Sequence, residues 1–135
     1  MRSDPSRPAM AVARSGDDVS AALPMHPRDF LILLALVDGA LHGYGLVKAI
    51  ETESEGEVLM DPANLYRSLR RLERDGLVAE AAGPEDGGES DDRRRYYGLT
   101  DFGRAVAVAE AARVRRLVRV ARTKDLLSAS EEGVS

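Results

Sequence analysis

The sequence predicts a mainly α-helical fold with one small β-hairpin. Residues 61–78 (DPANLYRSLRRLERDGLV) read as one short amphipathic helix, and a second such helix precedes it at residues 42–50. Downstream, two runs rich in Val, Tyr and Leu bracket a Gly/Pro/Asp stretch at residues 83–92, which predicts a hairpin. Two consecutive helices followed by a hairpin are typical of a winged helix-turn-helix, in which the hairpin forms the wing.

The helix at residues 62–75 has two clear ends and two faces. Asp61 is a good N-cap because its carboxylate can accept from the free amides of the first turn, and Pro62 suits the first helical position. Gly76 ends the helix. One face carries an apolar stripe at i, i+4 and i+7, formed by Leu65, Leu69 and Leu72. The other face carries four arginines, so this segment is locally positive in a chain of formal charge −4.

The polar face of this helix predicts contacts with DNA. Asn64 and Arg67 lie in the first turns, where a recognition helix meets base edges, and suit adenine and guanine respectively. The other arginines are expected to touch phosphates, and the Tyr66 hydroxyl to reach either a phosphate or only water. The alternative interpretation is a solvated helix face without a ligand. The predicted DNA-binding residues of helix and wing are Ala63, Asn64, Tyr66, Arg67, Arg70, Arg71, Arg74, Arg93, Arg94 and Arg95.

The wing is predicted to consist of strands at residues 77–82 and 94–99. A basic run, Arg93 to Arg95, stands at the base of the second strand, where alternation sends at least one side chain to each face. One or two of these arginines are expected to meet the DNA backbone. The tip between the strands should stay out of DNA, because phosphates would repel its five carboxylates. These are Glu85, Asp86, Glu89, Asp91 and Asp92.

The N-terminal part predicts an unstructured arm followed by a core helix. Residues 1–24 mix Ser, Asp, Arg and Ala without a period, so we expect a disordered arm. Pro27 opens the next helix, and its run at residues 30–37 is apolar on every face, which predicts burial from several sides. One face of this helix would pack on its own domain. Its second face could be covered only by another packed layer, either the last helix of this chain or that of a partner. This favours a dimer.

The last element is predicted to be a long helix from Thr100, a plausible N-cap, to about Leu127. Its apolar stripe contains small alanines that allow close approach of a second helix, and arginines occupy much of the remainder. The alternative is a helix that packs back on its own domain. The residues predicted for dimerisation are Ala107, Ala111, Val114, Leu117, Val118 and Ala121.

Short motifs between residues 27 and 103 occur together in the order and at roughly the separations of one bacterial family. They are His42-Gly43-Tyr44, Pro62 through Leu65-Tyr66 to Leu69 and Leu72-Glu73 with Gly76-Leu77, then Arg95-Tyr96-Tyr97 and Leu99-Thr100 with Gly103. The chain resembles the PadR-like family of bacterial transcriptional regulators. The resemblance implies a DNA-binding winged helix and dimerisation through the last helix. Some relatives hold flat drugs in an aromatic sandwich; this chain has no tryptophan, so a small-molecule effector is unsupported.

Composition excludes several function classes. At 135 residues the chain is expected to fold as one domain, and the absence of cysteine excludes disulfides and thiolate zinc sites. His26 and His42 are the only histidines, without a Gly-rich phosphate loop, so neither an enzyme, a metal site nor a cofactor is expected. No apolar run is long enough to span a bilayer and residues 1–24 lack a signal-peptide core, so we expect a soluble cytoplasmic protein.

These observations predict a sequence-specific transcriptional regulator, a repressor that binds a pseudo-palindromic operator of double-stranded DNA as a homodimer. Its expected parts are an arm at 1–24, the winged helix-turn-helix at 25–100, the dimerisation helix at 101–127 and a disordered tail at 128–135. The alternative function is a winged-helix module for protein contacts without specific DNA binding. Its partner surfaces would be the acidic wing and the arginine-rich last helix.

Overall fold

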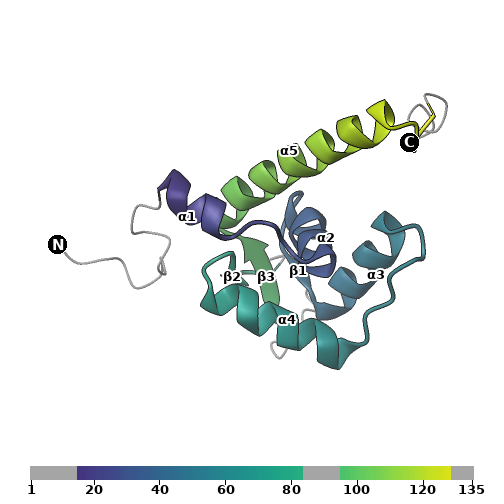
Figure 1. Ribbon diagram of the computed structural model, residues 1–135. Helices are drawn as coiled ribbons and strands as arrows, with labels where there is room; N and C mark the ends of the chain where they lie inside the picture. The colour runs from purple at the N-terminus through teal and green to yellow at the C-terminus, as the bar shows by residue number, and fades with distance from the viewer. Residues whose placement is uncertain (1–14, 84–94, 129–135) are drawn as a thin grey trace.

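The computed structural model describes residues 15–83 and 95–128 and shows five helices around a small sheet (Figure 1). The acidic wing tip, Arg93 and Arg94, and the predicted tail beyond residue 128 lie outside the described residues. In chain order the elements are α1 (Gly16–Ala21), α2 (Pro27–Leu36), β1 (Leu41–His42), α3 (Gly43–Glu53), α4 (Pro62–Arg74), β2 (Val78–Ala81), β3 (Tyr96–Leu99) and α5 (Asp101–Thr123).

Side-chain caps begin the helices where the sequence predicts them. The Asp61 carboxylate accepts from the Asn64 amide at 3.0 Å and starts α4. The Thr100 hydroxyl accepts from the amide of Gly103 at 2.9 Å and starts α5. Nδ1 of His42 starts α3 in the same way, so this histidine is used in local structure.

The expected disordered arm is wrong at residues 16–21, where α1 forms, and its first 14 residues lie outside the part of the chain that the structure describes. Ser15 and Asp18 build a capping box, with each side chain accepting from the other residue's backbone amide. The six-residue helix buries none of its residues fully. It packs against α5, and Val19 lies partly buried against the core, so a tertiary contact stabilises a segment whose composition suggested disorder.

The predicted hairpin is confirmed, and a third strand joins it. The sheet has the order β1-β3-β2 with antiparallel pairs throughout. Strand β1 contributes only Leu41 and His42, opposite Tyr97 and Tyr96. Two residues are too short to show the alternation by which a strand is recognised in a sequence.

The core lies between α2, α3, α4, the first turns of α5 and the sheet. It is built around the fully buried Ile32, Leu33, Leu46, Ile50, Leu65, Leu69, Val78 and Val106. The three leucines of the α4 stripe face this core, as predicted. The apolar run of α2 is buried on one side only, because Leu34 and Val37 are each 36% exposed. Burial from several sides, as expected from the sequence, is therefore not complete within this one chain.

Helix α5 begins in the core and ends beyond it. Phe102, Val106 and Ala107 are buried against the rest of the chain, whereas Leu117 and Val120 are 53% and 45% exposed. Ala107, which the sequence placed in a dimer seam, is thus only 7% exposed in a single chain and packs in its own core. The start of α5 packs closely against the backbone of Leu77. Glycine at position 103 allows this approach, because a Cβ there would collide with the Leu77 carbonyl oxygen.

A buried carboxylate ties α5 to the segment before α2. Glu110 is 2% exposed and accepts the Met25 amide at 3.2 Å. Arg113 donates to the same carboxylate from Nε at 2.9 Å and from Nη2 at 2.6 Å. The hydrogen bonds from Arg113 lower the pKa of Glu110, against the opposing effect of burial, with a further lowering contribution from the Met25 amide.

We expect Glu110→Gln to reduce the free energy of unfolding by roughly 1–2 kcal/mol near neutral pH, because the variant cannot form the charge-assisted bonds. The folded-state pKa lies below the ordinary value of 4.5, so the carboxylate's contribution is present above that pH. This contribution disappears as the pH falls through the folded-state pKa. The difference in free energy of unfolding between the wild type and Glu110→Gln should therefore vanish below that pH. Urea unfolding at a series of pH values measures this.

The matched control for this prediction is Glu80→Gln. Glu80 forms a longer 3.5 Å ion pair with Arg95, and both side chains are more than half exposed, so its removal should change stability by less than about 0.5 kcal/mol. A Glu110→Gln protein as stable as the wild type from acid to neutral pH would contradict a stabilising role for the buried pair.

Candidate nucleic-acid interface

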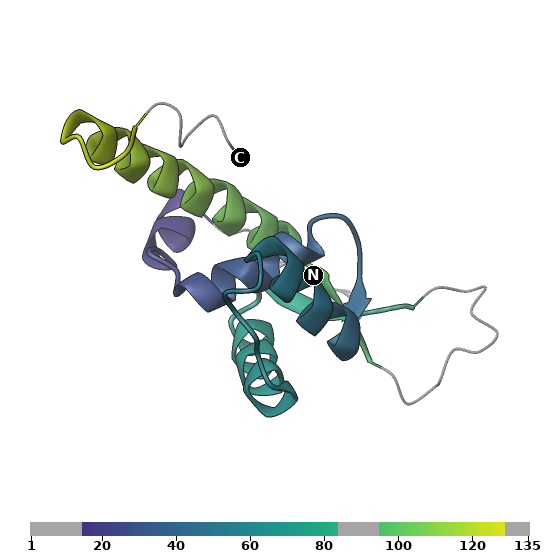
Figure 2. The ribbon, with the colours of Figure 1, turned by 90° about the vertical axis from the view of Figure 1, so that its right-hand side faces the viewer.

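Helix α4 lies on the side of the molecule opposite α5 (Figures 1 and 2), and three of its four arginines are exposed. At about 100° per residue, the side facing away from the buried leucines forms a crest. The crest residues, all exposed, are Ala63, Arg67, Arg70 and Arg74. Tyr66 and Glu73 lie on the flank beside the wing, while Asn64 and Arg71 lie on the opposite flank. Four of the residues predicted to bind DNA thus share the exposed crest, and three others lie on its two flanks.

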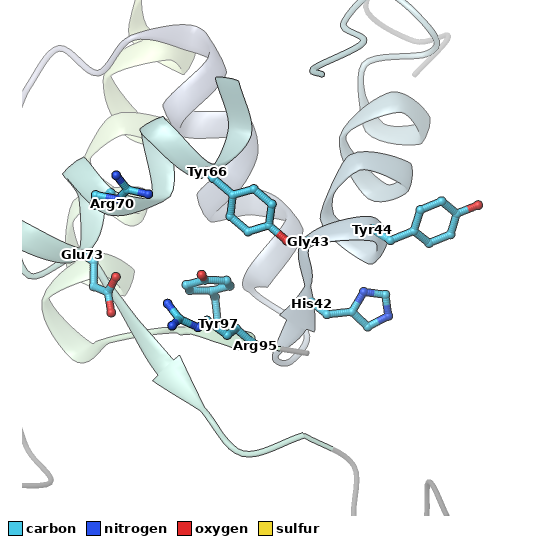
Figure 3. Close-up of a pocket in the computed structure, with 8 residues that line it drawn as sticks. All are labelled: His42, Gly43, Tyr44, Tyr66, Arg70, Glu73, Arg95 and Tyr97. Carbon is cyan, nitrogen blue, oxygen red and sulfur yellow. The ribbon is translucent and has the colours of Figure 1, made fainter. Parts of the chain in front are cut away.

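A groove of about 710 Å³ runs between α4 and the base of the wing (Figure 3). Three predicted DNA-binding residues meet there: Tyr66 and Arg70 from α4, and Arg95 just before β3. Its other lining residues were absent from the predicted site, and they are His42, Gly43, Tyr44, Glu73 and Tyr97. Their only sequence signal is their place in the motifs that carry the family resemblance.

The groove depends on a close approach between α3 and α4. The Tyr66 ring points at Gly43, and a Cβ at that glycine would collide with the tyrosine hydroxyl (Figure 3). Tyr66 stays 39% exposed, and Tyr44 on the rim is 69% exposed. His42 stacks on the Tyr44 ring with a centroid separation of 6.3 Å. The part of the groove formed by β1, α3 and α4 thus combines aromatic rings with hydroxyl groups, which can donate to phosphate oxygens.

The floor of the groove carries a tyrosine with a perturbed pKa. Tyr97 is 4% exposed, and burial, followed by the nearby charge of Glu73, raises the pKa of its hydroxyl. A hydrogen bond with Arg95 acts in the opposite direction. The hydroxyl therefore stays protonated at neutral pH and remains a donor. Two lining arginines, Arg70 and Arg95, face one lining carboxylate, Glu73, and Arg95 also forms the exposed 3.5 Å ion pair with Glu80. Such an exposed pair is weak, so both arginines can turn to an anionic ligand.

The opposite flank of α4 holds an ion pair that the sequence did not suggest. Nη2 of Arg71 donates to both Asp29 carboxylate oxygens, at 2.7 and 2.8 Å, and links α4 to the first turn of α2. The Asp29 side chain is only 13% exposed. Arg71 was predicted to touch phosphate; in the structure its Nη2 is bonded to Asp29, and the pair holds α4 against α2.

Asn64 is also engaged by its neighbours. Its side-chain Nδ2 donates to Oδ2 of Asp61 at 3.0 Å, and its Oδ1 accepts from Nη1 of Arg67 at 2.6 Å. The crest arginine is thereby held near the N-terminal end of α4. At the C-terminal end of α4, Nε of Arg74 lies 3.7 Å from Oδ1 of Asp75, and both side chains are more than half exposed. Such an exposed pair is weak and leaves Arg74 able to exchange partners.

Metal sites and membrane spans are absent from the described parts of the chain. Within residues 15–83 and 95–128 no group of three or more His, Cys, Asp or Glu side chains is arranged to hold a metal ion. No helix among those residues is both long and apolar enough to cross a membrane.

Comparison with known proteins identifies the family. Residues 32–109 match the model of the PadR-like family of transcriptional regulators, and they run from the second half of α2 to the first part of α5. The chain belongs to this family. The match contains α4, the strands β2 and β3 and the groove beside α4. A family of transcriptional regulators agrees with the expectation that the chain is not an enzyme.

The chain is also similar to one curated protein and to several solved structures, and the structures support the same fold. An uncharacterized 37.1 kDa protein in a Streptomyces fradiae transposon is 39% identical over 87 residues, which cover 64% of this chain and 23% of that protein. A PadR family transcription regulator from Clostridium difficile is 24% identical, with a TM-score of 0.59 over 70% of this chain and 94% of that one. A transcriptional regulator from Clostridium thermocellum is 22% identical, with a TM-score of 0.58 over 82% and 97%.

Proposed function

We propose that this PadR-like regulator is a repressor that binds a pseudo-palindromic DNA operator as a homodimer. The observation that carries the proposal is the crest of α4, where Arg67, Arg70 and Arg74 stand exposed on a helix whose other side is anchored in the core. A recognition helix held in this way enters the major groove and meets base edges with its N-terminal turns. Arg67 is the crest arginine nearest that end and suits a guanine edge.

The groove beside the wing supports this proposal, because its lining residues suit contacts with the phosphate backbone of DNA. Arg70 and Arg95 supply charge, and Tyr66 within the groove and Tyr44 on its rim supply hydroxyl groups as neutral donors. Phosphate contacts fix the register of the helix while base contacts provide specificity. The formal charge of the whole chain is −4, but the local distribution at α4 favours DNA.

The homodimer is supported by the overhanging half of α5. Leu117 and Val120 are large apolar side chains that remain about half exposed in a single chain, on a helix that leaves its own domain (Figure 2). Covering them with the same face of a second copy would bury apolar surface and give a symmetric pair of recognition helices. Two such helices reading successive major grooves require an operator with dyad symmetry.

Selection of bound DNA tests the proposed function. The full-length protein is mixed with fragmented genomic DNA at physiological salt, and the retained fragments are sequenced. We expect a recurrent motif with two inverted half-sites about one helical turn apart. Retention of DNA without any enriched motif, or no retention at all, would favour the alternative of a protein-contact module. A reporter gene placed downstream of the motif then distinguishes repression from activation.

A further inference from the structure

The flank of α4 that faces away from the wing has its own basic hollow. This hollow of about 200 Å³ lies between α4 and the first turn of α2. It is lined by His26, Arg28, Asp29, Met60, Asn64, Arg67, Ser68 and Arg71. Three arginines thus face a single carboxylate in a space that opens beside the exposed crest.

The charges in this hollow are not equivalent. Both carboxylate oxygens of Asp29 accept hydrogen bonds from Arg71, so the charges of these two side chains cancel. Arg67 is held by the neutral Asn64 side chain. Arg28 is exposed, and among residues 15–83 and 95–128 no carboxylate forms an ion pair with it. The hollow therefore keeps a net positive charge, concentrated on Arg28 and Arg67.

The dimensions of DNA explain why α4 should have two basic flanks. A major groove is about 12 Å wide, and an α-helix with its side chains measures about 10–12 Å across, so a helix that fills the groove faces a phosphate backbone on each side. The wing-side groove with Arg70 and Arg95 can serve only one of the two strands. The hollow at Arg28 lies on the other flank of the same helix.

We propose that the hollow between α2 and α4 is a second phosphate-binding site, in which Arg28 contacts the backbone of the DNA strand opposite to the one held at the wing. The inference rests on the proposed DNA-binding function and adds a residue and a strand to it. The Arg71–Asp29 ion pair acts as a positioning device, because it fixes the first turn of α2 against α4 and so sets the distance from Arg28 to the crest.

The first test is Arg28→Gln in the full-length protein. Because Arg28 is exposed, the variant should fold normally. We expect weaker binding to the selected operator and to a scrambled duplex by the same factor, roughly threefold to tenfold, with their ratio unchanged. The slope of log K against log salt should fall by about 0.9 for each phosphate that residue 28 no longer neutralises. Arg119→Gln, an exposed arginine on α5, is the matched control and should leave the slope unchanged.

A second experiment assigns the strand. Single methylphosphonate substitutions remove one phosphate charge at a time from the operator. At the phosphate that residue 28 contacts, the substitution should weaken binding of the wild type but not of Arg28→Gln. The corresponding phosphate for Arg95→Gln should lie on the other strand, across the major groove. An unchanged salt slope in Arg28→Gln, or both positions on one strand, would overturn the inference. A wild type that discriminates no operator would instead overturn the proposed function itself.

Discussion

Arg67→Ala is expected to remove most discrimination between the operator and a scrambled duplex. A good bidentate contact to a base is worth ~1–3 kcal/mol, and in a symmetric dimer the variant removes it from both half-sites together. The two affinities should therefore converge, chiefly through weaker operator binding. Titration of wild type and variant against both duplexes at one salt concentration measures the ratio.

Two further variants separate base reading from simple charge. Arg67→Lys keeps the charge but lacks the planar fork, so discrimination should fall while the salt dependence stays close to that of the wild type. Arg119→Ala removes one exposed arginine from α5, remote from α4, and should change neither quantity. If Arg67→Ala preserved the affinity ratio, the helix would be docked in a different orientation from the one proposed.

The local signals in the sequence were sufficient to predict α4. Asp61 caps the helix and the leucine stripe faces the core, while Gly76 follows the helix end with a φ of +83° that suits glycine. Each of these features is decided within a few residues of the chain. The same is true of the Thr100 cap and of the two wing strands, whose Val, Tyr and Leu content marks them in the sequence.

Long-range contacts account for what the sequence did not predict. Helix α1 depends on packing against α5, and Met25 just after it is held by Glu110, 85 residues away. The strand β1 exists only because β3 pairs with it. Arg71 is one of four arginines on α4, and only the folded chain shows that Asp29, 42 residues away, engages it. No periodicity along the chain could reveal these partners.

The second large effect is expected at the overhanging half of α5. Leu117 points along the side of the helix that meets the core further upstream, but at its own position it is 53% exposed. In the proposed dimer this side chain is buried by a second copy. Leu117→Asp would then bury an unpaired carboxylate, which costs several kcal/mol and is enough to dissociate a modest interface. Within a single chain the same charge would stay hydrated, so the domain should remain folded.

Val108→Asp is the matched control for this prediction. Val108 is 65% exposed on nearly the opposite side of α5, and the variant introduces the same charge. Sedimentation should show a wild-type and Val108→Asp dimer, and a Leu117→Asp monomer. Since two linked half-sites give a gain in effective concentration, the monomer should lose operator affinity by about tenfold or more with every DNA-facing residue intact. A monomeric wild type, or a Leu117→Asp dimer that binds the operator normally, would show that α5 does not join two copies through this face.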